Sequence, residues 1–141
     1  MNNQDIYALH PIGIVRSSLK RREDSPRQGF EGAPDAWLEI YQPYLDGMAD
    51  IRPDMELIVV TWLHLADRDV LKVHPRRKAD TALSGVFTTR SPDRPNPIGL
   101  HRVRVVAMDD RQRIRVHPIE ALDGTPIIDI KPILSGLPDD Q

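Results

Sequence analysis

The proline-rich segment over residues 85–100 constrains the fold of this chain more than any other stretch. It reads GVFTTRSPDRPNPIGL, with prolines at 92, 95 and 97 and a glycine at 99. Each proline fixes its own φ and lacks an amide donor, and each residue before a proline is pushed toward extended geometry. The β-branched and aromatic residues at the start of the segment favour a strand over 85–89. We therefore predict a short strand that ends in a stiff, extended loop.

Four polar side chains occupy this loop at positions that its prolines hold fixed. They are Arg90, Ser91, Arg94 and Asn96. Polar groups on a rigid loop suit a ligand site, because little conformational entropy is lost when they bind. A connector with solvated arginines is the alternative, and the residues alone do not separate the two.

Short apolar segments and turns rich in glycine and proline make up most of the remaining chain. Residues 57–63 (LIVVTWL) are apolar without alternation, which predicts a core strand buried on both faces. Gly13 is a candidate bulge in the first strand, and residues 123–126 (DGTP) predict a turn in which glycine takes a positive φ. Strands are expected over 6–17, 36–41, 55–65, 70–73, 101–108, 114–119 and 127–133, with a short helix over 43–51.

The order of these elements favours an all-β protein. A doubly wound α/β fold needs helices between its strands, and this pattern lacks them. We predict a small barrel or sandwich with long loops and at most one or two short helices. At 141 residues, a single domain spanning 1–141 is expected.

Composition excludes several kinds of chemistry. The chain has no cysteine, so it has no disulfide, thiolate metal site or cysteine nucleophile. Its five histidines are scattered without metal-ligand spacing, and no phosphate-binding glycine loop or serine nucleophile motif is present. The N-terminus lacks the pattern of a secretory signal and no apolar run reaches membrane-spanning length, so a cytoplasmic protein with no membrane partner is expected.

Positive charge is concentrated in the middle of the chain. Residues 68–104 hold nine Lys or Arg and three Asp or Glu, although the whole chain has a formal net charge of −2. This basic run is either a solvated face or a surface that contacts the phosphates of an RNA. The candidates for phosphate contact are Lys72, Arg76, Arg77, Lys78 and Arg94.

Four segments resemble motifs of the TsaA-like (TrmO) family, and they follow one another in the same order as in that family. They are residues 12–17 (IGIVRS), 26–28 (PRQ), 85–100 and 123–132 (DGTPIIDIKP). The resemblance covers nearly the whole chain, and its two long motifs are specific. It implies a small β-barrel, a homodimer, and an S-adenosyl-L-methionine-dependent methyltransferase that modifies N6 of threonylcarbamoyladenosine beside the anticodon of tRNA.

The resemblance also implies a site for the methyl donor, S-adenosyl-L-methionine. The implied contacts come from the loop at 26–28, the end of the core strand, both ends of the proline-rich segment, and the turn at 123–126. They are Pro26, Arg27, Gln28, His64, Leu65, Arg90, Leu100, Asp123, Gly124, Thr125 and Pro126. Arginine can hold the donor's carboxylate by charge-assisted hydrogen bonds, and Arg90 is the first candidate. No residue is assigned as a general base.

Other functions remain open at this stage. The chain could be a module that senses S-adenosyl-L-methionine or RNA without turnover, since no general base can be assigned. It could also methylate a small molecule other than tRNA. A barrel subunit with no ligand is the third alternative, and it leaves the stiff loop without a role.

Overall fold

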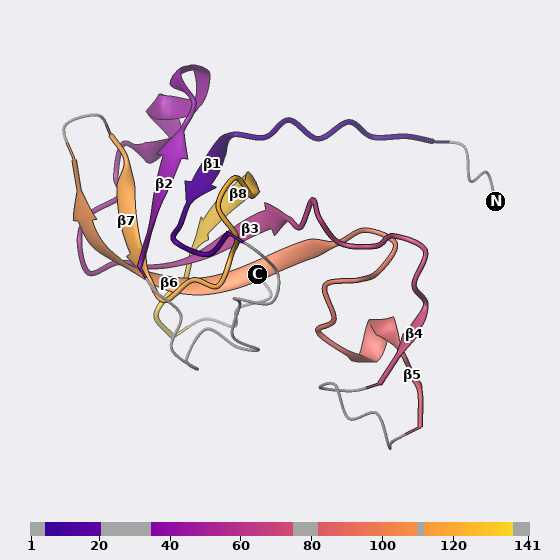
Figure 1. The fold of residues 1–141 in the computed structure, drawn as a ribbon. Helices are drawn as coiled ribbons and strands as arrows, with labels where there is room; N and C mark the ends of the chain where they lie inside the picture. Colours follow the sequence, from indigo (N-terminus) through magenta and orange to yellow (C-terminus); the bar gives the residue numbers. More distant parts are fainter. Residues whose placement is uncertain (1–4, 21–34, 75–81, 110–111, 137–141) are drawn as a thin grey trace.

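The fold is a closed β-barrel with a small second sheet beside it (Figure 1). The structure is a computed structural model, and it describes residues 5–20, 35–74, 82–109 and 112–136. In this part of the chain, six antiparallel strands close the barrel in the order β1-β2-β7-β6-β3-β8. They are β1 (Gly13–Arg16), β2 (Ala36–Ile40), β3 (Glu56–Trp62), β6 (Ile98–Met108), β7 (Ile114–His117) and β8 (Pro126–Pro132). The prediction of an all-β protein built on a small β-barrel is confirmed.

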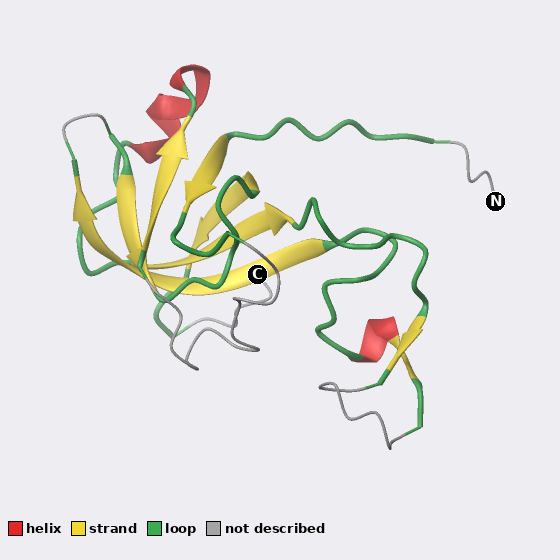
Figure 2. Cartoon of the chain, viewed as in Figure 1, coloured by secondary structure: helices red, strands yellow, loops and turns green. Residues whose placement is uncertain are grey.

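A small lobe stands away from the barrel (Figures 1 and 2). It comprises the described residues of 63–97, and it contains the paired strands β4 (Lys72–Val73) and β5 (Ser84–Gly85), followed by the 3-10 helix η5 (Val86–Thr88). A second 3-10 helix, η3 (Gln42–Met48), follows β2 and corresponds to the predicted helix. No helix in the described segments is both long and apolar enough to span a membrane.

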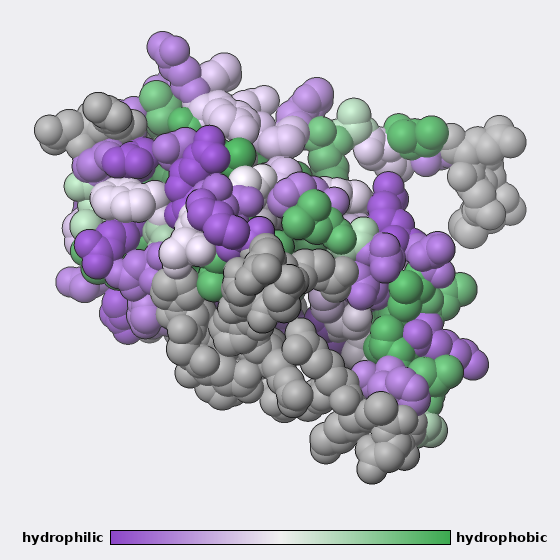
Figure 3. Space-filling view, in the orientation of Figure 1, coloured by the Kyte–Doolittle hydropathy of each residue, from purple (hydrophilic) through white to green (hydrophobic). Residues whose placement is uncertain are grey.

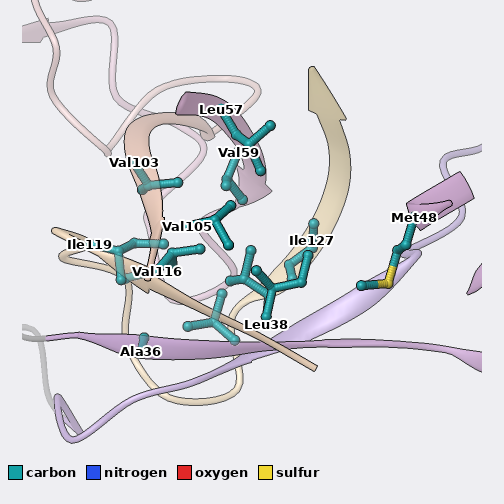
Figure 4. Close-up of a cluster of buried hydrophobic side chains, with 13 residues drawn as sticks. Ala36, Leu38, Met48, Leu57, Val59, Val103, Val105, Val116, Ile119 and Ile127 are labelled. Carbon is teal, nitrogen blue, oxygen red and sulfur yellow. The ribbon is translucent and has the colours of Figure 1, made fainter. Parts of the chain in front are cut away.

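Inward-pointing side chains of the barrel strands form the core (Figure 4), and they alternate with outward-pointing ones along β3 and β6. On β6, for example, residues 99, 101, 103 and 105 are buried and the residues between them are exposed. The core is mostly β-branched, which suits a pleated surface that is buried on one side. Its fully buried strand members include Val15, Leu38, Leu57, Val59, Val103, Val105, Ile114, Val116 and Ile127.

Residues outside the strands cover the two ends of the barrel. Met48 of η3 packs against the core at one end, with Leu45 and Ile51 beside it. Ile119 and Ala121, from the connection between β7 and β8, are buried at the other end. Figure 4 shows Met48 and Ile119 on opposite sides of the cluster. Both ends of the barrel are thus filled by side chains.

The prediction that residues 57–63 are buried on both faces is wrong. β3 alternates, with Leu57, Val59 and Thr61 buried and the residues between them partly exposed. The outer wall of the barrel is apolar here, on Val60 and Trp62, and both side chains stay partly exposed. An apolar run does not reveal whether its second face is covered, because the hydropathy is the same in both cases.

The strands predicted at 85–89 and 6–17 are also shorter than expected. The first ends at Gly85, because η5 begins at Val86 and the Thr88 hydroxyl donates to the Gly85 carbonyl. The second is confined to β1, and residues 5–11 extend from the barrel with exposed side chains. Gly13 is not at a bulge: it pairs in register with Ile40.

Gly13→Ala is expected to destabilise the protein, because a Cβ at this position would overlap the carbonyl oxygen of Glu39 on β2. That oxygen is backbone, so it cannot rotate away without disturbing the β1–β2 pairing. Overpacking of this kind costs about 1–3 kcal/mol. Urea unfolding measures the loss. Gly47→Ala in η3 is the matched control, since nothing lies within 4 Å of its added Cβ, and an equal loss in both variants would contradict the steric account.

Candidate functional site

Three long connections leave the barrel at the same end, which we call the loop end. The strands alternate in direction, so the connections 17–35, 63–97 and 118–125 all join strands at the side where β3 stops and β6 and β8 start. The predicted donor contacts fall in these connections or at the strand ends beside them. Pro26, Arg27 and Gln28 lie outside the described residues. The topology therefore brings the described candidate residues, which are far apart in sequence, to one end of the barrel.

Hydrogen bonds fasten the proline-rich loop (residues 90–97) to the segment that follows β3. The Leu63 amide donates to the Pro97 carbonyl at 2.8 Å, and the Arg94 amide donates to the Asp67 carbonyl at 3.0 Å. The Arg68 guanidinium donates to the Pro95 carbonyl at 2.7 Å and to the side chain of Asn96 at 3.1 Å. The loop is held at a fixed position, as its prolines predict.

Arg94 supports the shape of this loop from within. Its guanidinium donates to the carbonyl oxygens of Thr89 (3.1 Å), Ser91 (3.0 Å) and Val86. The Ser91 hydroxyl in turn accepts from the Asp93 amide. Arg94, Ser91 and Asn96 were expected to present polar groups to a ligand, but the contacts described here are internal to the lobe. Phosphate contact by Arg94 stays a prediction.

Arg90 differs from the other arginines of the lobe. Its side chain is exposed, and it makes no hydrogen bond or ion pair with the residues that the structure describes. His64 and Leu65 are exposed just beyond β3. Leu100 is 54% exposed on the outer face of β6, opposite Val60 of β3. Among the arginines described in the lobe, Arg90 is therefore the uncommitted one. The lobe also exposes apolar side chains, and Figure 3 shows green patches on this part of the molecule.

The turn at residues 123–126 is tied to the end of β1. Oδ1 of Asp123 accepts the Ser17 amide at 3.0 Å, and Oδ2 lies 3.1 Å from the ammonium of Lys20. These contacts, the amide hydrogen bond first, lower the pKa of Asp123. Gly124 has φ of 86°, which confirms the predicted positive φ. The Asp123 carboxylate therefore anchors the backbone of the turn to the end of β1.

A polar pair is buried inside the barrel at the loop end. Nε2 of His101 lies 2.8 Å from Oγ1 of Thr61, which is fully buried. Nδ1 of His101 has no hydrogen-bond partner among the described residues, and it lies 3.9 Å from Oε1 of Glu120. Burial lowers the pKa of His101 to about 4. The carboxylate is beyond hydrogen-bond distance, so burial dominates and the imidazole is neutral at pH 7.

An open groove of about 460 Å³ lies beside the Asp123 anchor. Its charged side chains are largely paired with one another: Arg115 contacts Asp35 at 2.7 Å, and Lys20 contacts Asp123. The side-chain hydrogen bond from Arg115 is the main cause that lowers the pKa of Asp35. The groove therefore offers few uncommitted charges to a ligand. Within the described residues, no three His, Cys, Asp or Glu side chains come together as a metal site.

The predicted phosphate contacts are only partly described. Lys72 is exposed on β4 of the small lobe. Arg76, Arg77 and Lys78 lie outside the described residues. The position of Lys72 on the same lobe as Arg90 is compatible with a basic surface next to the loop end.

Sequence reasoning missed the Thr61–His101 pair. The sequence predicts no contact between them, since His101 is one of five scattered histidines and Thr61 lies in an apolar run. The alternation over 101–105 (HRVRV) places position 101 on the same face as Val103 and Val105, and this pattern is the signal for its burial. The partner of His101 could not be found from sequence, because the two residues are 40 positions apart.

These features define a small closed-barrel domain whose long connections gather at one end. A family model for the tRNA-methyltransferase O N-terminal domain matches residues 14–137. The chain therefore belongs to the tRNA-methyltransferase O N-terminal domain family, which confirms the resemblance seen in its sequence motifs.

Individual proteins of known name or structure are similar over most of this chain. A probable S-adenosyl-L-methionine-binding protein of Methanothermobacter thermautotrophicus is 43% identical, over 88% of each chain. An S-adenosyl-L-methionine-binding protein of Archaeoglobus fulgidus is 45% identical, over 87% of this chain and 86% of the relative. The crystal structure of TrmO from Pseudomonas aeruginosa superposes with a TM-score of 0.72 at 28% identity. It is matched over 97% of this chain, which spans 61% of the solved one.

The buried histidine predicts how stability depends on pH. An unfolded histidine has a pKa near 6.5, above the folded value of about 4, so the unfolded chain takes up a proton first as the pH falls. The stabilisation present above pH 6.5 is therefore lost progressively toward pH 4, by about 3 kcal/mol for two to three pKa units. Urea unfolding at pH 7 and pH 4.5 measures this loss.

His101→Gln is the matched variant for this measurement, because glutamine can keep a hydrogen bond to Thr61 and does not titrate. Its stability should fall less than that of the unsubstituted protein over the same range. Parallel losses in the two proteins would mean that carboxyl groups, not His101, cause the acid sensitivity.

Proposed function

We propose that this protein binds S-adenosyl-L-methionine at the loop end of the barrel and is a methyltransferase that uses it. Its membership of the tRNA-methyltransferase O N-terminal domain family supports the activity. Relatives named as S-adenosyl-L-methionine-binding proteins support the cofactor. The prediction that residues 1–141 form one barrel domain, and that the protein is cytoplasmic, is retained as part of this proposal.

The observation that carries the donor site is the uncommitted guanidinium of Arg90 on a rigidly held loop. S-adenosyl-L-methionine has a carboxylate, an adenine ring and a sulfonium. Arg90 would bind the carboxylate by paired, charge-assisted hydrogen bonds. The exposed apolar side chains of Leu65 and Leu100 suit the face of the adenine, and the backbone of the 123–126 turn suits its edge.

The proposed reaction is an in-line displacement at the donor's methyl carbon. A nitrogen of the acceptor forms the new bond to carbon as the bond from carbon to sulfur breaks, which releases S-adenosylhomocysteine. The proton lost by the acceptor nitrogen passes to solvent or to a base. Because the donor is already activated, most of the acceleration would come from proximity and orientation.

Arg90→Ala is expected to weaken the binding of S-adenosylhomocysteine by roughly ten- to a hundredfold, the range for the loss of a charge-assisted hydrogen bond. Isothermal titration calorimetry measures the change. The control is Arg52→Ala, which removes an exposed arginine at the other end of the barrel and should bind normally. No binding of either S-adenosylmethionine or S-adenosylhomocysteine at millimolar ligand would overturn the proposal.

For the acceptor, we propose tRNA, with N6 of threonylcarbamoyladenosine beside the anticodon as the methylated atom. The support is the family, together with the local excess of positive charge over 68–104. Phosphates of the RNA would be bound by the basic run 72–78 and by Arg94. Loss of such contacts lowers both the affinity and its dependence on salt.

Labelled-methyl transfer to bulk tRNA, followed by mass spectrometry of its nucleosides, tests the acceptor. Transfer to an adenosine derivative is expected. Replacing both Arg76 and Arg77 by alanine should weaken tRNA binding and lower the slope of log affinity against log salt by about one per lost contact. Donor binding should stay unchanged in that double variant. Full tRNA affinity with the same slope would place the RNA surface elsewhere.

A binding module without turnover is the second candidate. The relatives' names, which describe binding and no reaction, favour it. Donor binding without methyl transfer to tRNA or to small-molecule pools would support this candidate. Transfer to a small molecule alone would support a methyltransferase with a different acceptor.

We also propose that the protein is a homodimer. Apolar side chains pair across the outer face of β3 and β6, where Trp62 lies opposite Ile98. Ile98 is 44% exposed, and Phe87 on the nearby lobe is 80% exposed. A second copy of the chain would remove this surface from water. Sedimentation at the concentrations used for calorimetry gives the mass that decides between monomer and dimer.

A further inference from the structure

His101 contacts three separate parts of the fold at the loop end. Its own strand is β6, and its Nε2 is hydrogen-bonded to Thr61 of β3. On its other side, Nδ1 faces Glu120 in the connection between β7 and β8, which is the charged group that the described residues place against the ring. One buried imidazole therefore lies where these three segments meet.

Each of the three segments continues directly into part of the proposed donor site. β3 runs into residues 64–65, and β6 carries Leu100 next to His101. Glu120 stands three positions before Asp123, whose carboxylate fixes the following turn to β1. A displacement of the imidazole would act on β6 through its own backbone, on β3 through the hydrogen bond to Thr61, and on Glu120 through the charge that lies 3.9 Å from Nδ1.

The barrel has space for this hydrogen bond because position 99 is glycine. A Cβ there would lie 2.6 Å from Oγ1 of Thr61 and 2.9 Å from Nε2 of His101. An alanine at position 99 would therefore clash with the Thr61 and His101 side chains in their present positions. A hydrogen-bonded polar pair in a core favours one arrangement of its strands, whereas apolar contacts tolerate sliding.

The position of Glu120 indicates where the ring's proton lies. A carboxylate 3.9 Å from Nδ1 favours the tautomer with hydrogen on Nδ1. Nε2 is then an acceptor, and the Thr61 hydroxyl donates to it. A glutamine side chain can supply an equivalent acceptor through its carbonyl oxygen, which an alanine cannot do.

We propose that His101 is a positioning residue for the methyl-donor site: by accepting from Thr61 and facing Glu120, it sets how the ends of β3 and β6 and the Asp123 turn lie relative to one another. This inference rests on the proposed donor binding. His101 is enclosed by the barrel and does not itself contact the donor.

Calorimetry with S-adenosylhomocysteine at pH 7 tests the role of the hydrogen bond. His101→Ala should weaken binding about tenfold, which is the equivalent of one lost hydrogen bond. His101→Gln should restore most of the affinity. Val103→Ala is the matched control, since Val103 is buried on the same face of β6 two positions away and carries no polar contact. It should lose stability and keep its affinity.

Three results would overturn the proposal. The first is that folded His101→Ala binds S-adenosylhomocysteine as tightly as the unsubstituted protein. The second is that His101→Gln binds S-adenosylhomocysteine no better than His101→Ala does. The third is that Val103→Ala loses as much affinity as His101→Ala, because the effect would then come from a general loss of stability.

Amide hydrogen exchange without ligand keeps the positioning role testable if donor binding itself fails. In His101→Ala, the amides of Leu63 and Thr125, which donate to Pro97 and Leu122, should exchange faster. The Tyr41 amide, which donates to Ile12 at the other end of the barrel, should be unchanged. A uniform change, or none, argues against positioning, whereas absence of S-adenosylhomocysteine binding in the unsubstituted protein argues against the proposed function. Should His101→Ala not fold, the same comparison is made with His101→Gln, which should exchange like the unsubstituted protein.

Discussion

Seven residue pairs join β3 to β6, and the arrangement of the candidate site depends on their register. The pairing runs from Glu56 opposite Arg104 to Trp62 opposite Ile98. It places Gly99 beside Thr61 and leaves Leu100 on the outer face. A slip by one residue would turn His101 toward solvent and Leu100 into the barrel, because side chains alternate with a period of two. The register thus fixes both the buried polar pair and the exposed apolar surface.

Most charged side chains near the site hold the protein's own shape. Arg94 donates to backbone carbonyls within its loop, and Arg68 bonds the same loop and lies over the ring of Trp62. Asp123 accepts an amide and contacts Lys20. Exposed ion pairs add little to stability one by one, but these contacts decide which charges are left for a ligand. Arg90 differs from Arg68 and Arg94 in its surroundings and not in its residue type.

The loop end joins the fold to the proposed function. A closed antiparallel barrel has no free edge, so variation in its long connections does not disturb the strand pairing. Here two of the connections are held in place within the described residues, one by the proline-rich loop's hydrogen bonds and the other by the Asp123 anchor. Such pinning lowers the entropy lost when a ligand binds. Rigid connections on a closed barrel are a consistent basis for a site that orients a small, flexible donor.

Local features of this protein could be predicted from its sequence. The Asp123-Gly124 turn, the strand at β2, the β6–β7 hairpin and the rigid proline-rich loop follow from residue types and spacing, which act over a few residues. The motifs also identified the family and its barrel. The candidate donor residues came from that resemblance, and the sequence could not say which of them have free polar groups.

Only the tertiary structure decided how the polar groups are used. Arg90 and Arg94 are four residues apart on one loop, yet Arg94 is directed to backbone carbonyls and Arg90 to solvent. Thr61 and His101 meet across 40 residues. The physical reason is that hydropathy periodicity specifies which face of a strand is buried, whereas the partner of a buried polar atom depends on strand order and register. Those are set by the closure of the whole barrel, which no local stretch of sequence contains.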